Sequence, residues 1–147
     1  MKISIGSDHA GFEQKQQLAA YLKGKGHTII DRGPENEDRV DYPDFAVPVA
    51  HDVAEGRAER GVLICGTGIG MALAADKVPG VRAANVVTPQ FGALCREHND
   101  CNIITLSGRF VEEPVNEQIL DEFLSTDFGG GRHEPRVAKI MDIDKEC

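Results

Sequence analysis

Short apolar runs alternate with amphipathic segments of helical spacing along nearly the whole chain, and this alternation limits the folds open to it. The apolar runs predict strands at residues 2–6, 28–30, 62–65, 81–87 and 102–106. The segments between and after them predict helices at residues 12–25, 45–54, 69–77, 90–97 and 114–124. Strands separated by helices pair in parallel through right-handed crossovers, so we expect an α/β/α sandwich around a five-stranded parallel sheet.

The length of 147 residues and the apolar content of 41% suit one domain, which we place over residues 1–147. A final helix is expected over about 132–146, directly after the flexible joint Gly129-Gly130-Gly131. This joint would let the helix swing away from its own sheet. We therefore expect the C-terminal helix to pack on a partner subunit.

The acidic balance of the chain argues against two classes of partner. Its formal charge of −8 repels nucleic-acid backbones and anionic membrane surfaces, and no apolar run approaches the roughly 20 residues that span a bilayer. No signal-type apolar region precedes Ser7, so we expect a cytoplasmic location. The four cysteines contain no Cys-x-x-Cys pair, which favours reduced thiols over disulfides.

The segment Val62-Leu63-Ile64-Cys65-Gly66-Thr67-Gly68-Ile69-Gly70 carries the most chemical information in the chain. A buried strand ends there on a cysteine, and a glycine-dense turn leads into the next helix. Successive amides in such a turn, together with the helix N-terminus, would hold an anion and favour the thiolate form of the cysteine. The alternative is a buried cysteine that acts only as a small apolar side chain. Its place at the carboxyl end of a strand favours catalysis.

Other glycine-rich phosphate loops fit this turn poorly. A P-loop needs Gly-Lys-Ser/Thr, whereas Met71 and Ala72 follow Gly70 here. The glycine spacing is too compressed for a dinucleotide fingerprint, and no acidic residue follows the next strand. A cysteine phosphatase would need an arginine where Met71 stands, so phosphoryl transfer at Cys65 is not expected.

Further polar residues each allow a functional and a structural interpretation. His98, near a predicted helix end, suits proton transfer, with Asn99 next to it for a substrate hydroxyl, but an exposed capping histidine fits equally well. Cys95 and Cys101 flank His98 at zinc-like spacing without an evident fourth ligand.

Asp8 follows the first strand, where capping of the next helix is the default role. Arg132 and Arg136 are one helical turn apart, which suits either a phosphate group or a solvated helix start. We expect Asp8, His9, Cys65, the glycine turn, Ser107 and Arg109 to meet at the carboxyl edge of the sheet. A base, an anion-holding loop and a proton-transferring imidazole would act together, and we expect all three, His98 included, at that one edge.

Several motifs in order resemble the type B ribose 5-phosphate isomerases, a family that includes galactose 6-phosphate isomerase subunits. The motifs are Gly6-Ser7-Asp8-His9-Ala10-Gly11-Phe12, Asp41-Tyr42-Pro43, Cys65-Gly66-Thr67-Gly68-Ile69-Gly70, Arg96-Glu97-His98-Asn99-Asp100, and Gly130-Gly131-Arg132-His133 with Arg136. The resemblance implies a Rossmann-like dimer, or a dimer of dimers, with active sites between subunits. It also implies interconversion of an aldose phosphate and its ketose without metal or organic cofactor.

The resemblance assigns roles to individual residues. Cys65 matches the base that moves a proton between C1 and C2 through an enediolate, assisted by Thr67. His98 matches the acid/base that opens the sugar ring, and Asp8 a residue near the sugar hydroxyls. The remaining matches are substrate contacts: Tyr42, the amides of Gly66, Thr67, Gly68, Ile69 and Gly70, the hydroxyl contact Asn99, and a phosphate grip of His9, Arg109, Arg132 and Arg136. The two last arginines would reach in from the neighbouring subunit.

Some relatives use a glutamate near the glycine loop as the base, but residues 71–75 here are Met-Ala-Leu-Ala-Ala. Ribose 5-phosphate is the expected substrate, with another four- to six-carbon sugar phosphate such as allose, galactose or tetrose phosphate as the alternative. A non-catalytic module that binds a phosphorylated metabolite is the competing class, because this type of fold serves many functions.

Overall fold

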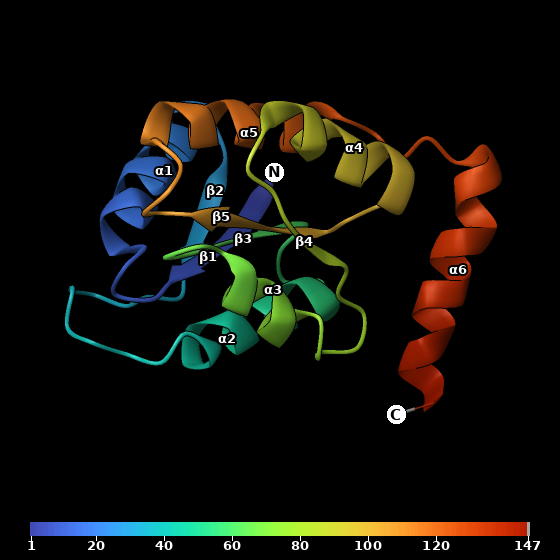
Figure 1. Cartoon of the computed structure of the whole chain (residues 1–147), viewed down its shortest axis with the longest axis horizontal. Helices are drawn as coiled ribbons and strands as arrows, with labels where there is room; N and C mark the ends of the chain where they lie inside the picture. Colours follow the sequence, from blue (N-terminus) through green and yellow to red (C-terminus); the bar gives the residue numbers. More distant parts are fainter. Residues whose placement is uncertain (147) are drawn as a thin grey trace.

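The computed structural model describes residues 1–146 and forms one α/β/α sandwich (Figure 1). The strands are β1 (Lys2–Ser7), β2 (Thr28–Asp31), β3 (Arg60–Cys65), β4 (Ala83–Asn85) and β5 (Ile103–Ser107). The helices are α1 (Phe12–Gly24), α2 (Pro43–Ala54), α3 (Ile69–Ala75), α4 (Pro89–Asn99), α5 (Glu113–Ser125) and α6 (Glu134–Ile143), with short 3-10 turns at Gly131–His133 and Asp144–Glu146. The five strands pair in parallel in the order β2-β1-β3-β5-β4, which confirms the predicted sheet.

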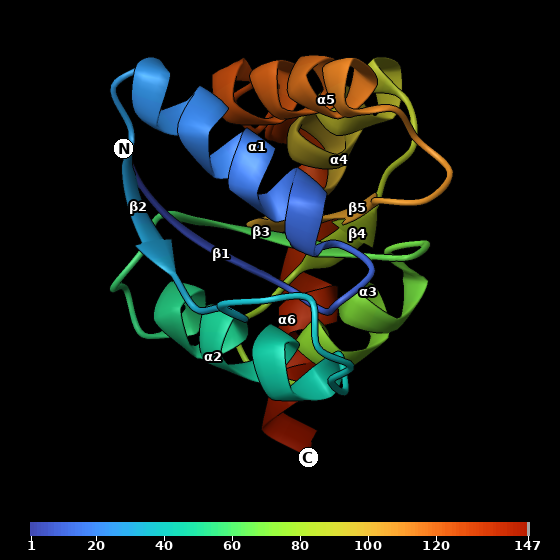
Figure 2. The same ribbon diagram turned by 90° about the vertical axis from the view of Figure 1, so that its left-hand side faces the viewer.

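Helices cover both faces of the sheet, as Figure 2 shows from the side. α1, α4 and α5 pack on one face through buried side chains such as Leu18, Leu22 and Phe123. α2 and α3 pack on the other face through Val49 and Met71. The central strands β3 and β5 are mostly apolar because both of their faces are buried.

One predicted strand is considerably shorter in the structure. The apolar run at 81–87 forms only β4, Ala83–Asn85, at the edge of the sheet. Val81 belongs to the preceding turn, where its amide donates to Val78, and the Thr88 side chain accepts from the Phe91 amide at the start of α4. The other elements agree with prediction to within about two residues.

The C-terminal helix α6 stands beside the sandwich instead of joining either of its layers (Figure 1). Two of its few polar contacts with the body are Arg82 Nη1 to Met141 Sδ at 3.3 Å and the Gly80 amide to Asp144 Oδ2 at 2.8 Å. A hollow of about 400 Å³ separates α6 from β4 and is lined mainly by apolar groups. The predicted helix at about 132–146 is present as the 3-10 turns and α6, and its predicted packing on a partner stays a prediction.

Asp52, on α2, is a buried charge that anchors this helix to the sheet. Its side chain is 0% exposed and accepts hydrogen bonds from Ser4, Arg32 and Arg57. Burial raises the pKa of this carboxyl, but the three hydrogen bonds and the nearby charges outweigh burial and hold the pKa well below its usual range. Asp52 is therefore ionised in the folded protein at neutral pH.

We expect Asp52→Asn to lower the free energy of unfolding by about 3 kcal/mol at pH 7, because the buried hydrogen-bonded charge is lost while the arginines stay half-solvated. The stabilisation by Asp52 is present above its unfolded pKa, near 4, and is lost as pH falls. Thermal unfolding at pH 7 and pH 3 checks this, because the difference between parent and variant should shrink at the lower pH. An equal difference at both values would contradict it.

No helix among residues 1–146 combines the length and the apolar character needed to cross a bilayer.

Candidate active site

The carboxyl ends of β1, β3 and β5 meet at one edge of the sheet and bring the predicted residues after them together. Cys65 pairs with Ser107 across β3 and β5. The Asp8 amide donates to Ile64 O over 3.2 Å, and the Arg109 amide donates to Gly66 O over 3.1 Å. The prediction that the segments after these strands converge is therefore confirmed.

Cys65 lies at the centre of this edge with its thiol 5% exposed. One side of the residue belongs to the apolar layer that also contains Val49 and Met71. On the other side, the Gly68 amide donates to Cys65 Sγ over 3.1 Å. The cysteine is thus buried, as its structural interpretation requires, and also hydrogen-bonded to the glycine loop, as the catalytic interpretation requires.

The glycine loop, residues 66–70, needs glycine at two positions for steric reasons. Gly68 has φ = +86°, and a Cβ there would lie 2.2 Å from Asn85 Nδ2. At Gly70, a Cβ would lie 2.6 Å from the ring of Tyr42, so the ring packs directly on the backbone. Between them, the Ile69 amide donates to Thr67 Oγ1 over 3.1 Å. Loop residues 67 and 69 are exposed, so the loop forms a surface over Cys65.

Arg109 lies against the same loop. Its Cδ and Nη1 atoms would be 3.4 Å from a Cβ at Gly66, which means that the guanidinium side chain covers this glycine. The residue is exposed and follows β5. A cation beside the thiol and the loop amides is suitably placed for an anionic group of a ligand.

Asp8 and His9 make local hydrogen bonds that define their orientation. Asp8, 8% exposed, accepts from the Gly11 amide at 3.0 Å within the turn that precedes α1. The N-cap of α1 is Gly11 and no side chain caps the helix, so the predicted capping role of Asp8 is wrong. His9 Nδ1 accepts from the Val40 amide at 3.2 Å. Because a backbone amide can only donate, His9 Nδ1 carries no proton, and in the neutral ring Nε2 is the donor.

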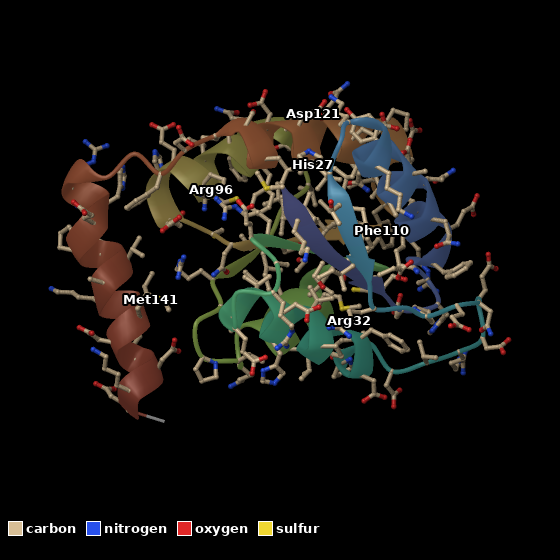
Figure 3. The ribbon with its side chains drawn as sticks, turned by 180° about the vertical axis from the view of Figure 1, so that it is seen from behind. His27, Arg32, Arg96, Phe110, Asp121 and Met141 are labelled. Atoms are coloured by element: carbon tan, nitrogen blue, oxygen red, sulfur yellow. The ribbon has the colours of Figure 1, made fainter. Side chains whose placement is uncertain are left out.

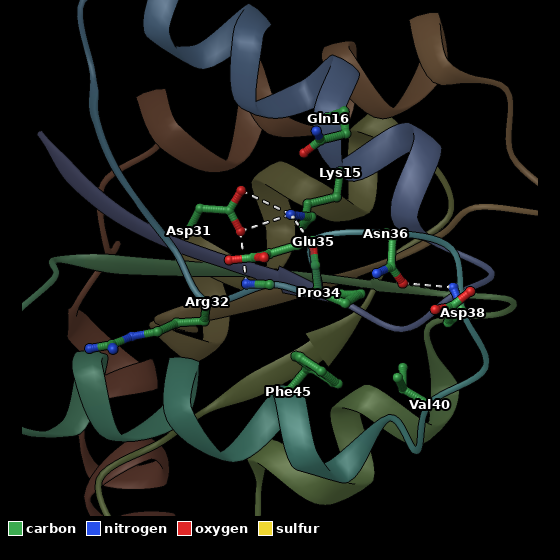
Figure 4. A pocket seen from close by; sticks show the side chains of 11 residues that line it. Lys15, Gln16, Asp31, Arg32, Pro34, Glu35, Asn36, Asp38, Val40 and Phe45 are labelled. Carbon is green, nitrogen blue, oxygen red and sulfur yellow. Dashed lines mark hydrogen bonds and ion pairs between the residues drawn. The ribbon is translucent and has the colours of Figure 1, made fainter.

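The segment from Asp31 to Tyr42 is held at its base by a buried lysine, as Figure 4 shows. Lys15 Nζ donates to both Asp31 carboxylate oxygens at 2.8 and 2.9 Å and to Pro34 O at 3.0 Å, with its side chain only 2% exposed. A pocket of about 780 Å³ lies beside this contact. The same segment supplies the Val40 amide to His9 and the Tyr42 ring to the glycine loop.

With the sugar phosphate expected from the sequence as substrate, Lys15→Met should raise KM about fivefold while changing kcat less, because a looser segment weakens the hydrogen bond that orients His9. Steady-state kinetics check this. Lys25→Met is the control, since it removes a lysine that is bonded to Asp121 at a distance from this segment. Equal KM values for the parent and Lys15→Met would contradict the role given to the loop anchor.

His98 and Asn99 do not share the edge of Cys65 within one chain, so that prediction is wrong. They end α4, and a helix that leads into a strand ends at the amino end of that strand. Ile103 begins β5 there, whereas Ser107 ends it beside the thiol. Five strand residues span about 13 Å. Figure 3 shows the two ends, with Arg96 near α6 and Phe110 away from it.

His98, Arg132 and Arg136 instead form a second group at the junction of α4 and α6. The rings of His98 and His133 stack with centroids 4.5 Å apart and planes 16° from parallel. Partial burial, and then the positive charges of His98, Arg132 and Arg136, lower the pKa of His133. The Gly129 amide donates to Glu97 O over 2.9 Å, which ties the arginine segment to the end of α4. Both arginines are exposed.

The zinc interpretation of Cys95, His98 and Cys101 gains no support. Both cysteines are buried free thiols, and Cys95 Sγ donates to Gly92 O over 3.3 Å. His98 faces His133 instead. Within residues 1–146 no group of three or more histidine, cysteine or acidic residues is placed to hold a metal ion.

Comparison with known proteins decides between the expected classes. A family model described as Ribose/Galactose Isomerase matches residues 3–140. The chain belongs to this family. It is 45% identical to the probable ribose-5-phosphate isomerase B of Mycoplasma genitalium, over 98% of this chain and 96% of that one. It is 40% identical to ribose-5-phosphate isomerase B of Escherichia coli, over 98% and 97%.

Solved structures agree with this assignment. Ribose-5-phosphate isomerase B of Clostridium thermocellum superposes with a TM-score of 0.98 at 46% identity, covering 99% of each chain. The Mycoplasma genitalium enzyme with bound ribulose 5-phosphate gives a TM-score of 0.95 at 44% identity, covering 99% of this chain and 97% of that one. This member of the family is an isomerase, which sets aside the alternative of a non-catalytic module.

Proposed function

We propose that the protein interconverts ribose 5-phosphate and ribulose 5-phosphate, with Cys65 as the base. The observation that carries the proposal is the hydrogen bond from the Gly68 amide to Cys65 Sγ, in a loop where the neighbouring residues Thr67 and Ile69 are exposed. The relatives named ribose-5-phosphate isomerase B support the choice of sugar. Allose, galactose and tetrose phosphates remain the alternative substrates.

The proposed proton transfer uses the thiolate of Cys65. It takes the proton from C2 of the open-chain aldose, which leaves an enediolate, and returns a proton to C1 to give the ketose. Backbone amides of the glycine loop donate to the enediolate oxygens, where negative charge develops. Thr67 Oγ1 already accepts from the Ile69 amide, so its own hydroxyl proton is available to a substrate oxygen.

Substrate binding at this edge uses residues on either side of the thiol. His9, with Nε2–H as the donor, and the exposed Arg109 suit the phosphate group. Asp8, whose amide donates to Ile64 O at the end of β3, suits a sugar hydroxyl. Tyr42 closes one side where its ring packs on Gly70. None of these contacts requires a metal or an organic cofactor.

The ring-opening step needs a second copy of the chain. His98 is the proposed acid/base, yet it lies at the far end of β5 from the thiol of its own chain. We infer that His98, Asn99, Arg132 and Arg136 of one subunit complete the site around Cys65 of the other. The two groups found in one chain would then be complementary halves of two shared sites.

Apolar surface supports such a dimer. Ile69 and Leu73 on α3, Phe91 on α4 and Ile140 on α6 are each between 47% and 64% exposed. The glycine joint before α6 and the hollow beneath that helix suit its docking on a partner. A homodimer, or a dimer of such dimers, would bury these side chains and gain hydrophobic stabilisation. A solution mass of at least about twice the 15.9 kDa of one chain is expected in light scattering.

A panel of four- to six-carbon aldose phosphates, followed by the appearance of ketose, tests the substrate. We expect the highest kcat/KM with ribose 5-phosphate and lower values with allose, galactose and tetrose phosphates. A higher kcat/KM with a six-carbon sugar would replace ribose 5-phosphate as the assigned substrate.

A further inference from the structure

Three consecutive carbonyl groups of the glycine loop are bonded to side chains of the sheet beneath. Ser107 Oγ, Asn85 Nδ2 and Thr105 Oγ1 donate to the carbonyls of residues 66, 67 and 68 over 2.7, 3.1 and 2.7 Å. Asn85 ends β4, and the other two lie on β5. Polar side chains inside apolar strands are the sequence signal for these residues. The sequence placed Ser107 at this edge but left Asn85 and Thr105 without a role.

Further hydrogen bonds fix the direction in which the Thr105 and Ser107 hydroxyls donate. Asn85 Nδ2 also donates to Thr105 Oγ1 over 3.1 Å, so the single hydroxyl proton of Thr105 is directed to the loop. Ser107 Oγ accepts from the Phe110 amide over 2.9 Å, which directs its proton to the loop in the same way. Thr105 and Ser107 are buried, so water does not compete for either bond.

Peptide geometry converts these contacts into an orientation of the loop amides. In a trans peptide the C=O and N–H bonds point in opposite directions. Carbonyls 66, 67 and 68 are held toward β4 and β5, so amides 67, 68 and 69 point away from these two strands. Of these, amide 68 donates to Cys65 Sγ at the end of β3, and amide 69 donates to Thr67 Oγ1. In the peptide group that joins Thr67 to Gly68, both opposite hydrogen bonds are present. Its carbonyl accepts from Asn85, and its N–H donates to Cys65 Sγ.

We propose that Asn85, Thr105 and Ser107 are positioning residues for isomerisation, which orient the loop amides toward the thiol and the substrate oxygens. The proposal rests on the proposed function of the Cys65 site. Preorganised donors stabilise developing charge without reorganisation during the reaction, so a loop freed from its supports is a poorer oxyanion cradle. The loss should affect kcat more than binding.

Thr105→Val tests the proposal, because valine keeps the shape of threonine and removes only the hydroxyl donor. We expect kcat for ribose 5-phosphate to fall at least about tenfold, with KM changed less than about twofold. Hydrogen exchange at the Gly68 amide should also accelerate at least about tenfold. The variant removes the bond from Thr105 to the Gly68 carbonyl and the acceptor that helps to hold Asn85.

Two control variants separate positioning from folding. Thr105→Ser retains the hydroxyl and should keep kcat within about threefold of the parent. Ser4→Ala removes another buried strand hydroxyl, which donates over 2.7 Å to Asp52 at a distance from the loop, and should leave kcat and Gly68 exchange unchanged. Ser107→Ala, read in the same two assays, is the second test variant if Thr105→Val folds poorly.

The two readouts distinguish failure of this inference from failure of the proposed function. Parent-like kcat and Gly68 exchange in both Thr105→Val and Ser107→Ala would overturn the positioning role. If Gly68 exchanges faster in these variants but the parent protein does not isomerise ribose 5-phosphate, the side chains still support the loop and the proposed substrate is overturned.

Discussion

Cys65→Ala is expected to lower kcat by about a thousandfold or more while leaving the affinity for ribose 5-phosphate close to that of the parent. The thiol is the proposed base, and residues 71–75 contain no carboxylate that could replace it. Substrate affinity should persist because the loop amides, His9 and Arg109 remain. Ketose formation and titration calorimetry measure the two quantities separately.

Cys101→Ala is the matched control for this experiment. Cys101 is as buried as Cys65, at 5% exposure, and is also a free thiol, but it lies at the amino end of β5. We expect parent-like turnover in this variant, with at most a modest loss of stability from the small cavity. Full activity in Cys65→Ala would remove the thiol from the mechanism and leave the glycine loop as a binding site only.

The sheet was predictable because its strands are buried on both faces. Val62 to Ile64 is a continuous apolar run, and Ile103 to Leu106 is apolar except for Thr105. Helical spacing between these runs leaves little choice but parallel pairing. The strand predicted at 81–87 was too long because not all of its apolar residues lie in the sheet. Val81 and Val86 are buried, but Val87 is half-exposed, and only three residues pair with β5.

The carboxyl-edge half of the site was predictable for a similar reason. Cys65, Asp8 and Arg109 follow strands directly in the sequence, so their edge is fixed once the strands run parallel. His98 was wrongly predicted at the carboxyl edge because the prediction ignored that His98 directly precedes a strand. In a parallel sheet a residue that ends a helix lies at the amino edge, and the order of elements alone contains that information.

The supports beneath the loop could not be placed from sequence. Thr105 and Asn85 are neighbours only because β4 pairs with β5 in a register that puts one opposite the other. A polar residue in a strand indicates a buried hydrogen bond, but its partner depends on that register. The loop carbonyls become the partners because Gly68, with positive φ, turns the chain back over β5.

Activity should return when two inactive variants share one dimer. His98→Ala is expected to lower turnover about a hundredfold through the loss of its acid/base. In a dimer of one Cys65→Ala chain and one His98→Ala chain, one shared site combines the intact Cys65 of one chain with the intact His98 of the other. Random co-assembly in a twofold dimer should then restore about a quarter of the parent activity.

The control for this mixing experiment replaces His98→Ala with a chain carrying both substitutions, which should restore nothing because no thiol is supplied. If Cys65 and His98 served the same site within one chain, every mixed site would lack one of the two groups, and mixing would leave activity unchanged. The length of β5 between the two residues makes that outcome incompatible with direct contact of both groups with one sugar phosphate. Recovery on mixing therefore measures how the two halves of the site are divided between subunits.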